Sequence, residues 1–291
     1  MRKIAAILVF CAGVLWGSMG IFVRLFESAG LGAMEIVTIR VITTTLIMIS
    51  FLLIYKRRLL VIRWKDIWCF LGTGIVSIVF FNFCYFKAIT VTSLSVAAVL
   101  LYTAPAFVIV FSHFLFGESL TARKIAALIL TFAGCVLVTG VIGHTDSVGT
   151  SGILLGLGAG LGYAMYTIFS RFALQRGYHS FTISFYTFLI AAIGVLPLAD
   201  LQKAFRVSCA STVMLGYSFL FGLLSTVLAF ILYTTGMSMM DSGKASIIAS
   251  VEPVVATIIG VVLYHESMTL SEWVGIGMVL SAIVMCSTKN S

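Results

Sequence analysis

The chain has 291 residues, of which 61% are hydrophobic and 10% are charged, and its formal net charge is +8. Soluble globular domains carry roughly 25% charged residues, so a soluble protein of this length could not bury so much apolar side chain. The composition therefore predicts an integral membrane protein, and the positive charge follows membrane topology, as shown below, rather than indicating nucleic-acid binding.

Apolar stretches long enough to cross ~30 Å of hydrocarbon, at ~1.5 Å per residue, recur along the whole chain. The basic start "MRKIAAILVF" is compatible with a signal peptide, but no clear small-residue cleavage site follows, so we expect a retained first helix. The connections are mostly short and hold no soluble domain. Ten windows are predicted to be helical: 4–23, 34–55, 67–87, 92–116, 124–142, 151–171, 179–199, 211–235, 243–264 and 272–288.

Lysine and arginine are distributed unequally between the two sides of these windows. With the N-terminus placed in the cytoplasm, 13 basic residues lie on the cytoplasmic side and 4 on the outer side, with Arg40 left inside a helix. This bias predicts that both termini are cytoplasmic, in agreement with an even number of helices. We expect a multi-pass protein of the cell (inner) membrane.

The two halves of the chain repeat the same order of motifs. "GESLT" at 117–121 corresponds to "HESMT" at 265–269, an offset of 148, and Pro105 corresponds to Pro253 at the same offset. Other matches at offsets of 147 or 148 pair Gly13 with Gly160, Trp16 with Tyr163, Arg24 with Arg171, Gly74 with Gly222, Ser77 with Ser225 and Tyr85 with Tyr233. Two five-helix domains, residues 1–143 and 150–288, are predicted. An odd number of helices inverts the second copy, as in many secondary transporters.

With these motifs the chain resembles the EamA-type transporters of the drug/metabolite transporter superfamily. The resemblance rests on the 5+5 plan of ten helices, on Trp16 and Arg40, and on the "P…GE" and "P…HE" ends of the fourth and ninth helices. It covers residues 5 to 287. It implies a bacterial or archaeal plasma-membrane carrier of small metabolites or drugs, with a cavity lined mainly by helices 1, 3, 4, 6, 8 and 9.

Pro105 and Pro253 occupy equivalent positions inside the fourth and ninth windows. Proline removes a helical hydrogen bond and leaves a carbonyl that needs another partner inside a membrane. Paired interruptions of this kind indicate a transporter site, although a kink used only for packing is the alternative. Glu252 precedes Pro253, and an ionised Glu at that depth costs roughly 2.5–3.5 kcal/mol. It is expected either to bind a proton or a cationic substrate group, or to hydrogen-bond the freed carbonyl.

Several other residues are candidates for the walls of a cavity. Arg40 lies near the outer end of the second window, where it is expected to anchor the outer vestibule or to contact an anion. Aromatic walls with a few polar tips suit amphipathic organic solutes, although packing also recruits aromatics. The predicted substrate-binding set is Trp16, Asn82, Tyr85, Tyr102, Tyr163, Tyr233 and Glu252.

Glu118 and Glu266 follow the fourth and ninth windows and face opposite sides of the membrane. We expect each to cap the short turn before the next helix. The glycine pairs Gly13/Gly17 and Gly156/Gly160 have GxxxG spacing, which allows close helix packing.

The sequence favours a secondary transporter over an enzyme. It contains no nucleotide motif, no metal-ligand cluster and no other sign of a cofactor, and intramembrane acids are not paired as catalysis would require. The predicted function is transport of small organic metabolites across the plasma membrane by alternating access, as an exporter of amino acids or related compounds, with Glu252 as the site of proton coupling. An uncoupled facilitative permease or a drug efflux carrier is the alternative. The expected partners are a small-molecule substrate, the lipid bilayer and protons, and the sequence does not indicate an oligomeric state.

Overall fold

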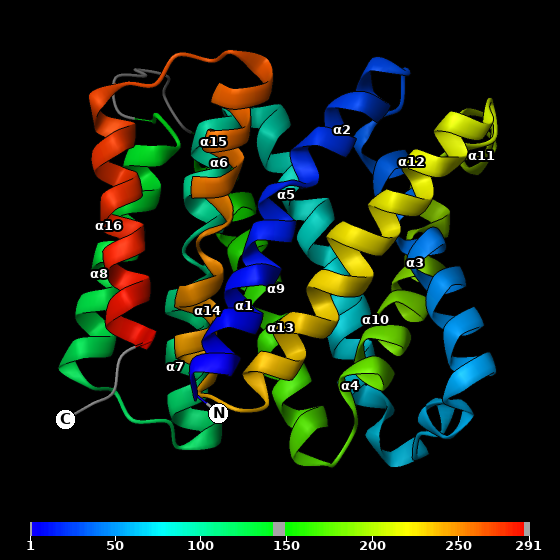
Figure 1. The fold of residues 1–291 in the computed structure, drawn as a ribbon, viewed down its shortest axis with the longest axis horizontal. Helices are drawn as coiled ribbons and strands as arrows, with labels where there is room; N and C mark the ends of the chain where they lie inside the picture. The colour runs from blue at the N-terminus through cyan, green and yellow to red at the C-terminus, as the bar shows by residue number, and fades with distance from the viewer. Residues whose placement is uncertain (1, 142–148, 288–291) are drawn as a thin grey trace.

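The computed structural model describes residues 2–141 and 149–287, and all regular structure in these ranges is helical. The helices form a bundle in which most axes run in roughly the same direction (Figure 1). Helix α1 begins and helix α16 ends at the same side of the bundle, the lower side in Figure 1. This side is called the N-terminal face below, and the other is called the opposite face.

The first half of the chain crosses the bundle five times. The crossings are α1 (Arg2–Gly17) with α2 (Met19–Ser28), α3 (Ala33–Tyr55), α4 (Ile67–Leu71) with η3 (Gly72–Val79) and α5 (Phe80–Val91), α6 (Leu94–Leu101) with α7 (Ala104–Phe116), and α8 (Ala122–Val138). Two short 3₁₀ turns, η1 (Arg57–Leu60) and η2 (Trp64–Asp66), connect the second crossing to the third.

The second half repeats this order. Its crossings are α9 (Thr150–Gln175), α10 (Ser180–Val195) with η4 (Leu196–Leu198), α12 (Thr212–Gly222) with η5 (Leu223–Leu228) and α13 (Ala229–Met237), α14 (Ser242–Ala249) with α15 (Glu252–Tyr264), and α16 (Leu270–Ser287). The short helix α11 (Leu201–Ser208) precedes α12 at the opposite face.

Nine of these crossings, within the described ranges, are at least 18 residues long and apolar enough to span a membrane. The tenth, α8, has 17 residues and ends four residues before the expected 142. The chain is an all-α membrane protein, as its composition predicted.

The third and eighth crossings contain a π-helical segment at the same place in each repeat. Residues Gly72–Val79 and Leu223–Leu228 overlap when they are aligned at the offset of 148. Gly74 and Gly222 lie at these segments and face the other repeat: a Cβ on Gly74 would lie 2.7 Å from Ile190 Cγ2, and one on Gly222 would lie 2.9 Å from Thr43 Cγ2. The widened turns therefore occur where the two repeats are in close contact, and π-bulges are frequent at functional sites.

The fourth and ninth crossings are interrupted immediately before their prolines. Helix α6 ends at Leu101 and α7 begins at Ala104, while α14 ends at Ala249 and α15 begins at Glu252. Pro105 and Pro253 occupy the first turn of the second half-helix, where proline's missing N–H leaves no intrahelical bond unmade. The break is thus a local stop and restart rather than a bend in a continuous helix.

Two glycines pack against the carbonyls that these breaks leave free. Pro105 cannot donate to Leu101 O, and Pro253 cannot donate to Ala249 O. A Cβ on Gly160 would lie 3.2 Å from Leu101 O, and one on Gly13 would lie 2.8 Å from Ala249 O. Each repeat therefore supplies the glycine that covers the broken helix of the other repeat, and the absence of a side chain allows the close approach.

Candidate functional site

A small cavity lies between the two helix breaks. Its lining residues come from the end of α6 and the start of α7, from α9, and from the junction of α14 and α15. The cavity volume is about 10 Å³, which is room for about one water molecule. The bundle is therefore closed around its centre, and a small organic molecule would require the helices to separate. The lining residues are Tyr102, Ala104, Pro105, Tyr163, Ser246, Ala249, Ser250 and Glu252.

Glu252 is the carboxylate in this cavity. It is the first residue of α15, so it sits at a helix N-terminus, where free backbone N–H groups favour negative charge. The hydroxyl of Tyr163 on α9 donates a hydrogen bond of 3.0 Å to Glu252 Oε2. The carboxylate of Glu252 is thus bound by Tyr163, which the sequence also proposed as a site residue. It is not bound by the carbonyl of Ala249, which faces Gly13.

Arg40 is the basic residue whose charge acts on Glu252. Its side chain on α3 is only 6% exposed, and it interacts electrostatically with Glu252. Its Nη1 donates to the sulfur of Met19 at 2.9 Å, which is a weak acceptor, and its buried Nε has no hydrogen-bond partner. The sequence placed Arg40 at an outer vestibule. The structure buries the guanidinium instead, where the charge of Glu252 compensates for part of the lost hydration.

Trp16 and Tyr233 lie beside the cavity in an aromatic cluster. The Trp16 ring packs 6.2 Å from Tyr163, 5.1 Å from Phe230 and 5.1 Å from Tyr233, measured between ring centroids. The buried indole N–H of Trp16 has no acceptor. The Tyr233 hydroxyl shares a 2.7 Å hydrogen bond with Thr167 Oγ1. This cluster connects α1, α9 and α13, and the Tyr163 ring packs against it.

Asn82 and Tyr85 occupy different surroundings, although both lie on α5. Asn82 is buried and its amide donates to Ile78 O of its own helix at 2.7 Å. The Tyr85 ring stacks 5.8 Å from Phe81, which in turn packs against Tyr163 at 5.6 Å. Neither residue is among those that line the cavity, although Tyr85 lies near enough to Glu252 to interact with its charge.

Two serines contribute to the cavity that the sequence analysis did not single out. Ser246 and Ser250 are one turn apart on α14, and Ser250 Oγ donates to Ser246 O at 3.2 Å. Their i, i+4 spacing before Glu252 was visible in "SIIASVEP", but small hydroxyl residues at this spacing also serve helix packing. Only the approach of α9 and α6 shows which face they occupy.

The set of residues at and around this cavity can bind polar and charged groups. It offers one carboxylate, one buried guanidinium, several phenol hydroxyls and two serine hydroxyls. Within residues 2–141 and 149–287, no cluster of three or more His, Cys, Asp or Glu side chains is placed to hold a metal ion.

Several known proteins with similar sequences are described as transporters. The chain is 25% identical to the uncharacterized transporter YxxF of Bacillus subtilis (strain 168), over 99% of this chain and 91% of that protein. It is 30% identical to an uncharacterized transporter of Archaeoglobus fulgidus over 69% of this chain and 70% of that one. It is also 22% identical to the uncharacterized inner membrane transporter YicL of Salmonella typhimurium, over 97% and 94% of the two chains.

The fold is shared with a protein of known crystal structure. That structure is 17% identical in sequence, superposes with a TM-score of 0.80, and is covered over 96% of its length by 98% of this chain. The model of the EamA-like transporter family matches the chain twice, at residues 3–140 and 150–288. With two family repeats over nearly its whole length, this chain belongs to the EamA-like transporter family and is a multi-pass membrane transporter.

Proposed function

We propose that this protein is a secondary transporter that exports amino acids or related small organic metabolites across the plasma membrane by alternating access, coupled to protons through Glu252. The observation that carries the proposal is the Tyr163–Glu252 contact of 3.0 Å, which lies in a cavity at the junction of two interrupted helices. Discontinuous helices in corresponding halves are the usual location of substrate and ion sites in such transporters.

The charges of the site support a zwitterionic substrate. Glu252 offers a carboxylate to an ammonium group, and Arg40 offers an underused guanidinium to a carboxylate. Arg is suited to carboxylate recognition because its planar donors can bind both oxygens. The aromatic cluster around Trp16 offers an apolar wall to the remainder of the solute. An α-amino acid carries both an ammonium and a carboxylate group, so it can engage both residues.

Proton coupling is supported by the enclosed position of Glu252, which is the one carboxylate among the residues that line the cavity. A single carboxyl group that is enclosed in one conformation and hydrated in another can make the conformational equilibrium depend on pH. We expect the other conformations to expose the cavity to one side of the membrane at a time, since a volume of about 10 Å³ admits no organic solute.

The test is transport by the purified protein in proteoliposomes. A panel of amino acids, related metabolites and cationic drugs is loaded, and flux is measured with and without a pH gradient. The proposal expects saturable flux of at least one zwitterion and acceleration by an imposed gradient. Saturable flux that ignores the gradient would instead show an uncoupled permease, and flux of drugs alone would show a drug efflux carrier. No saturable flux of any solute would leave a non-transporting membrane component or an intramembrane enzyme.

A further inference from the structure

Two matched groups of polar residues lie at the two faces of the bundle. Because of the repeat, each residue near one face has a counterpart near the other at an offset of 147 or 148. Glu118, just after α7, and Arg171, near the end of α9, lie at the N-terminal face, where these helices end in Figure 1. They correspond to Glu266, just after α15, and Arg24, in α2, at the opposite face. The structure gives the members of each pair different partners, so the two faces are not in the same state.

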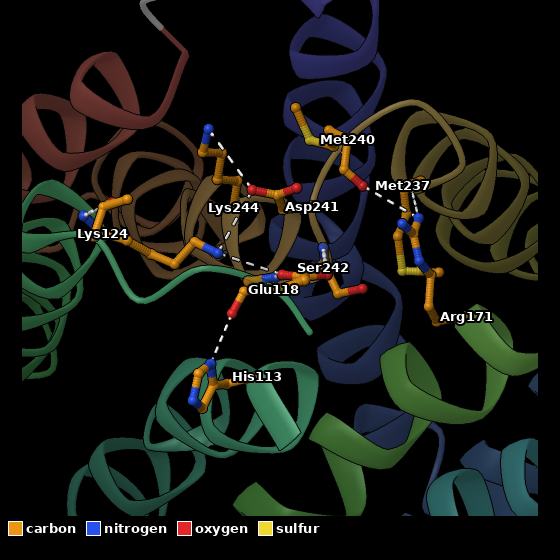
Figure 2. Close-up of polar contacts among 11 residues, drawn as sticks. His113, Glu118, Lys124, Arg171, Met237, Met240, Asp241, Ser242 and Lys244 are labelled. Atoms are coloured by element: carbon orange, nitrogen blue, oxygen red, sulfur yellow. Dashed lines mark hydrogen bonds and ion pairs between the residues drawn. The ribbon is translucent and has the colours of Figure 1, made fainter. Parts of the chain in front are cut away.

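At the N-terminal face, Glu118 closes a contact between the repeats. Its two carboxylate oxygens accept hydrogen bonds from the backbone N–H of Ser242, at 2.6 Å, and of Gly243, at 3.2 Å. These are the first N–H groups of α14, which a carboxylate satisfies well. Lys124 Nζ lies 3.4 Å from Glu118 and 3.5 Å from Asp241, and Figure 2 shows these groups converging. The sequence analysis expected Glu118 to cap its own turn, but it caps a helix of the other repeat.

Arg171 reinforces the same closure. Its Nη1 donates to Met237 O at 3.0 Å and to Met240 O at 3.3 Å, at the end of α13 (Figure 2). Carbonyls at a helix C-terminus have no intrahelical donor, and an arginine satisfies them favourably. Glu118 and Arg171 therefore hold the start of α14 and the end of α13, the two ends of one short connection.

At the opposite face the counterparts do not make these contacts. Glu266 pairs with Arg24 at 2.7 Å, and both side chains are 50% exposed. Arg24 also lies over the Tyr264 ring, 4.1 Å from its centroid. The residue that corresponds to Ser242 is Leu94, which is 61% exposed, whereas Ser242 is fully buried. The first N–H groups of α6 are capped only by Ser93, through a 3.2 Å bond from Val96 N.

We infer that these two groups are interchangeable latches, of which one closes its face while the other is open. In the structure the N-terminal latch, Glu118 with Arg171, is closed. In the other state Glu266 would accept from the backbone N–H of Leu94 and Ser95, and Arg24 would reach the carbonyls of Ile89 and Thr92. Glu118 and Arg171 would then be released. In the present state Arg24 and Glu266 pair with each other. Because an exposed pair of this kind stabilises little, both residues can leave it at small cost and form the other latch.

The inference rests on the proposed transport cycle, but it is tested without any substrate. Two variants with one introduced cysteine each report the two faces: Leu94→Cys and Ser242→Cys, each in a background where the exposed Cys11 and Cys209 are replaced by Ser and the buried cysteines are kept. Both substitutions keep the backbone N–H that the latch uses, and Ser242 Oγ has no partner to lose. The rate of reaction with a charged maleimide is measured in detergent or nanodiscs, against the same background without the introduced cysteine.

We expect Leu94→Cys to react and Ser242→Cys to be protected in the parent protein. Glu118→Gln should raise the labelling rate of Ser242→Cys about tenfold and lower that of Leu94→Cys, since a weakening by ~1.4 kcal/mol shifts an equilibrium tenfold. The matched substitution Glu266→Gln should not raise Ser242→Cys labelling, and adding it to Glu118→Gln should restore protection. If Glu118→Gln does not purify, Glu118→Asp, which withdraws the carboxylate by one carbon, takes its place.

Three results would overturn the inference. They are unchanged Ser242→Cys labelling in Glu118→Gln, faster labelling of both cysteines together, and the same direction of change in the Glu118 and Glu266 variants. The second of these would mark Glu118 as a purely structural cap. If Glu118→Gln exchanges the labelling of the two cysteines but the protein transports no solute, the latches are supported and the proposed function is rejected. If the protein transports a solute but the labelling does not exchange, the proposed function is supported and the latches are rejected.

Discussion

Glu252 combines three features that do not normally occur together in a membrane-spanning helix. It carries an ionisable group, it begins a half-helix, and it accepts a hydrogen bond from Tyr163 on another helix of the same repeat. The neighbouring Arg40 supplies an opposite charge inside the same bundle. Such residues are costly at this depth, and they persist where their charge has a task.

We expect Glu252→Gln to abolish the response of transport to a pH gradient while leaving the protein folded. Gln keeps the size of the side chain and can still accept from Tyr163, but it cannot take up or release a proton. Flux in proteoliposomes is measured at several pH values, and folding is checked by size-exclusion profile and thermal midpoint. The control is Glu27→Gln, an exposed residue of α2, which should change neither. Unchanged pH dependence in Glu252→Gln would make the residue a structural partner of the helix break.

The helix breaks depend on close packing between elements of opposite repeats. Gly160 of α9 lies against the end of α6, and Gly13 of α1 lies against the end of α14, at the corresponding place. The carbonyls freed by the prolines point toward these glycines. A break that is covered by a helix without a side chain can be buried without a large void, so the glycines make the interruptions tolerable.

Gly160→Ala should destabilise the protein by about 1–3 kcal/mol, the usual cost of overpacking. The added Cβ would lie 2.5 Å from Thr103 Oγ1 and 2.8 Å from Leu100 O, and the second of these is backbone that cannot rotate away. The thermal midpoint in detergent measures the effect. Gly277→Ala on α16 is the control, because its Cβ would meet no atom within 4 Å and should cost nothing. Equal midpoints for the two variants would contradict the packing argument.

The end of α15 carries a strained residue that its repeat counterpart avoids. His265 has a φ of +55°, and Gly117, at the corresponding end of α7, has a φ of +66°. Left-handed backbone costs an L-residue roughly 1–2 kcal/mol, and glycine avoids most of this cost. His265→Gly should therefore raise stability by about 1 kcal/mol, seen as a higher thermal midpoint. Gly117→Ala makes the reverse change at the corresponding position and should lower the thermal midpoint. A lower midpoint in both variants would show that the contacts of the His265 side chain stabilise the protein by more than its backbone strain costs.

At the scale of the whole molecule, the repeat lets one half support the other. The π-helical segments, the helix breaks, the glycines and the latch residues all occur in pairs. The glycines at the breaks and Glu118 contact the opposite repeat. Exchange of the conformations of the two halves would change which face is closed without a new set of contacts. In the proposed transport cycle, the bundle would have two states of similar energy.

We predict that the two domains, residues 1–143 and 150–288, have opposite orientations in the membrane and that both termini are cytoplasmic. The excess of Lys and Arg on the N-terminal side is the physical reason. Cysteines would be introduced singly at exposed positions, Leu120 on the N-terminal side and Leu270 on the other, in a background where the exposed Cys11 and Cys209 are replaced by Ser. They would be labelled in intact cells with an impermeant reagent. Only Leu270→Cys should react from outside. Labelling of Leu120→Cys alone would reverse the topology, and labelling of both would reject it.

The sequence by itself determined the class of the protein, its ten crossings and its two repeats. Apolar length, charge bias and repeated short motifs are local or periodic properties, and a bilayer imposes a fixed length on every crossing. It also indicated Glu252, Pro105 and Pro253, since an acid and a proline are unusual in such a segment. The family model matches the chain twice, at residues 3–140 and 150–288.

Only the tertiary structure decided which polar groups meet. The sequence did not show that Tyr163 donates to Glu252, that Arg40 is buried, or that Asn82 bonds its own helix. It also could not show that Glu118 caps α14 while Glu266 pairs with Arg24. These partners are more than 80 residues apart, except for Asn82's, and two equivalent motifs can be in different states. The choice between the states depends on how the two halves pack, which no local pattern in either half records.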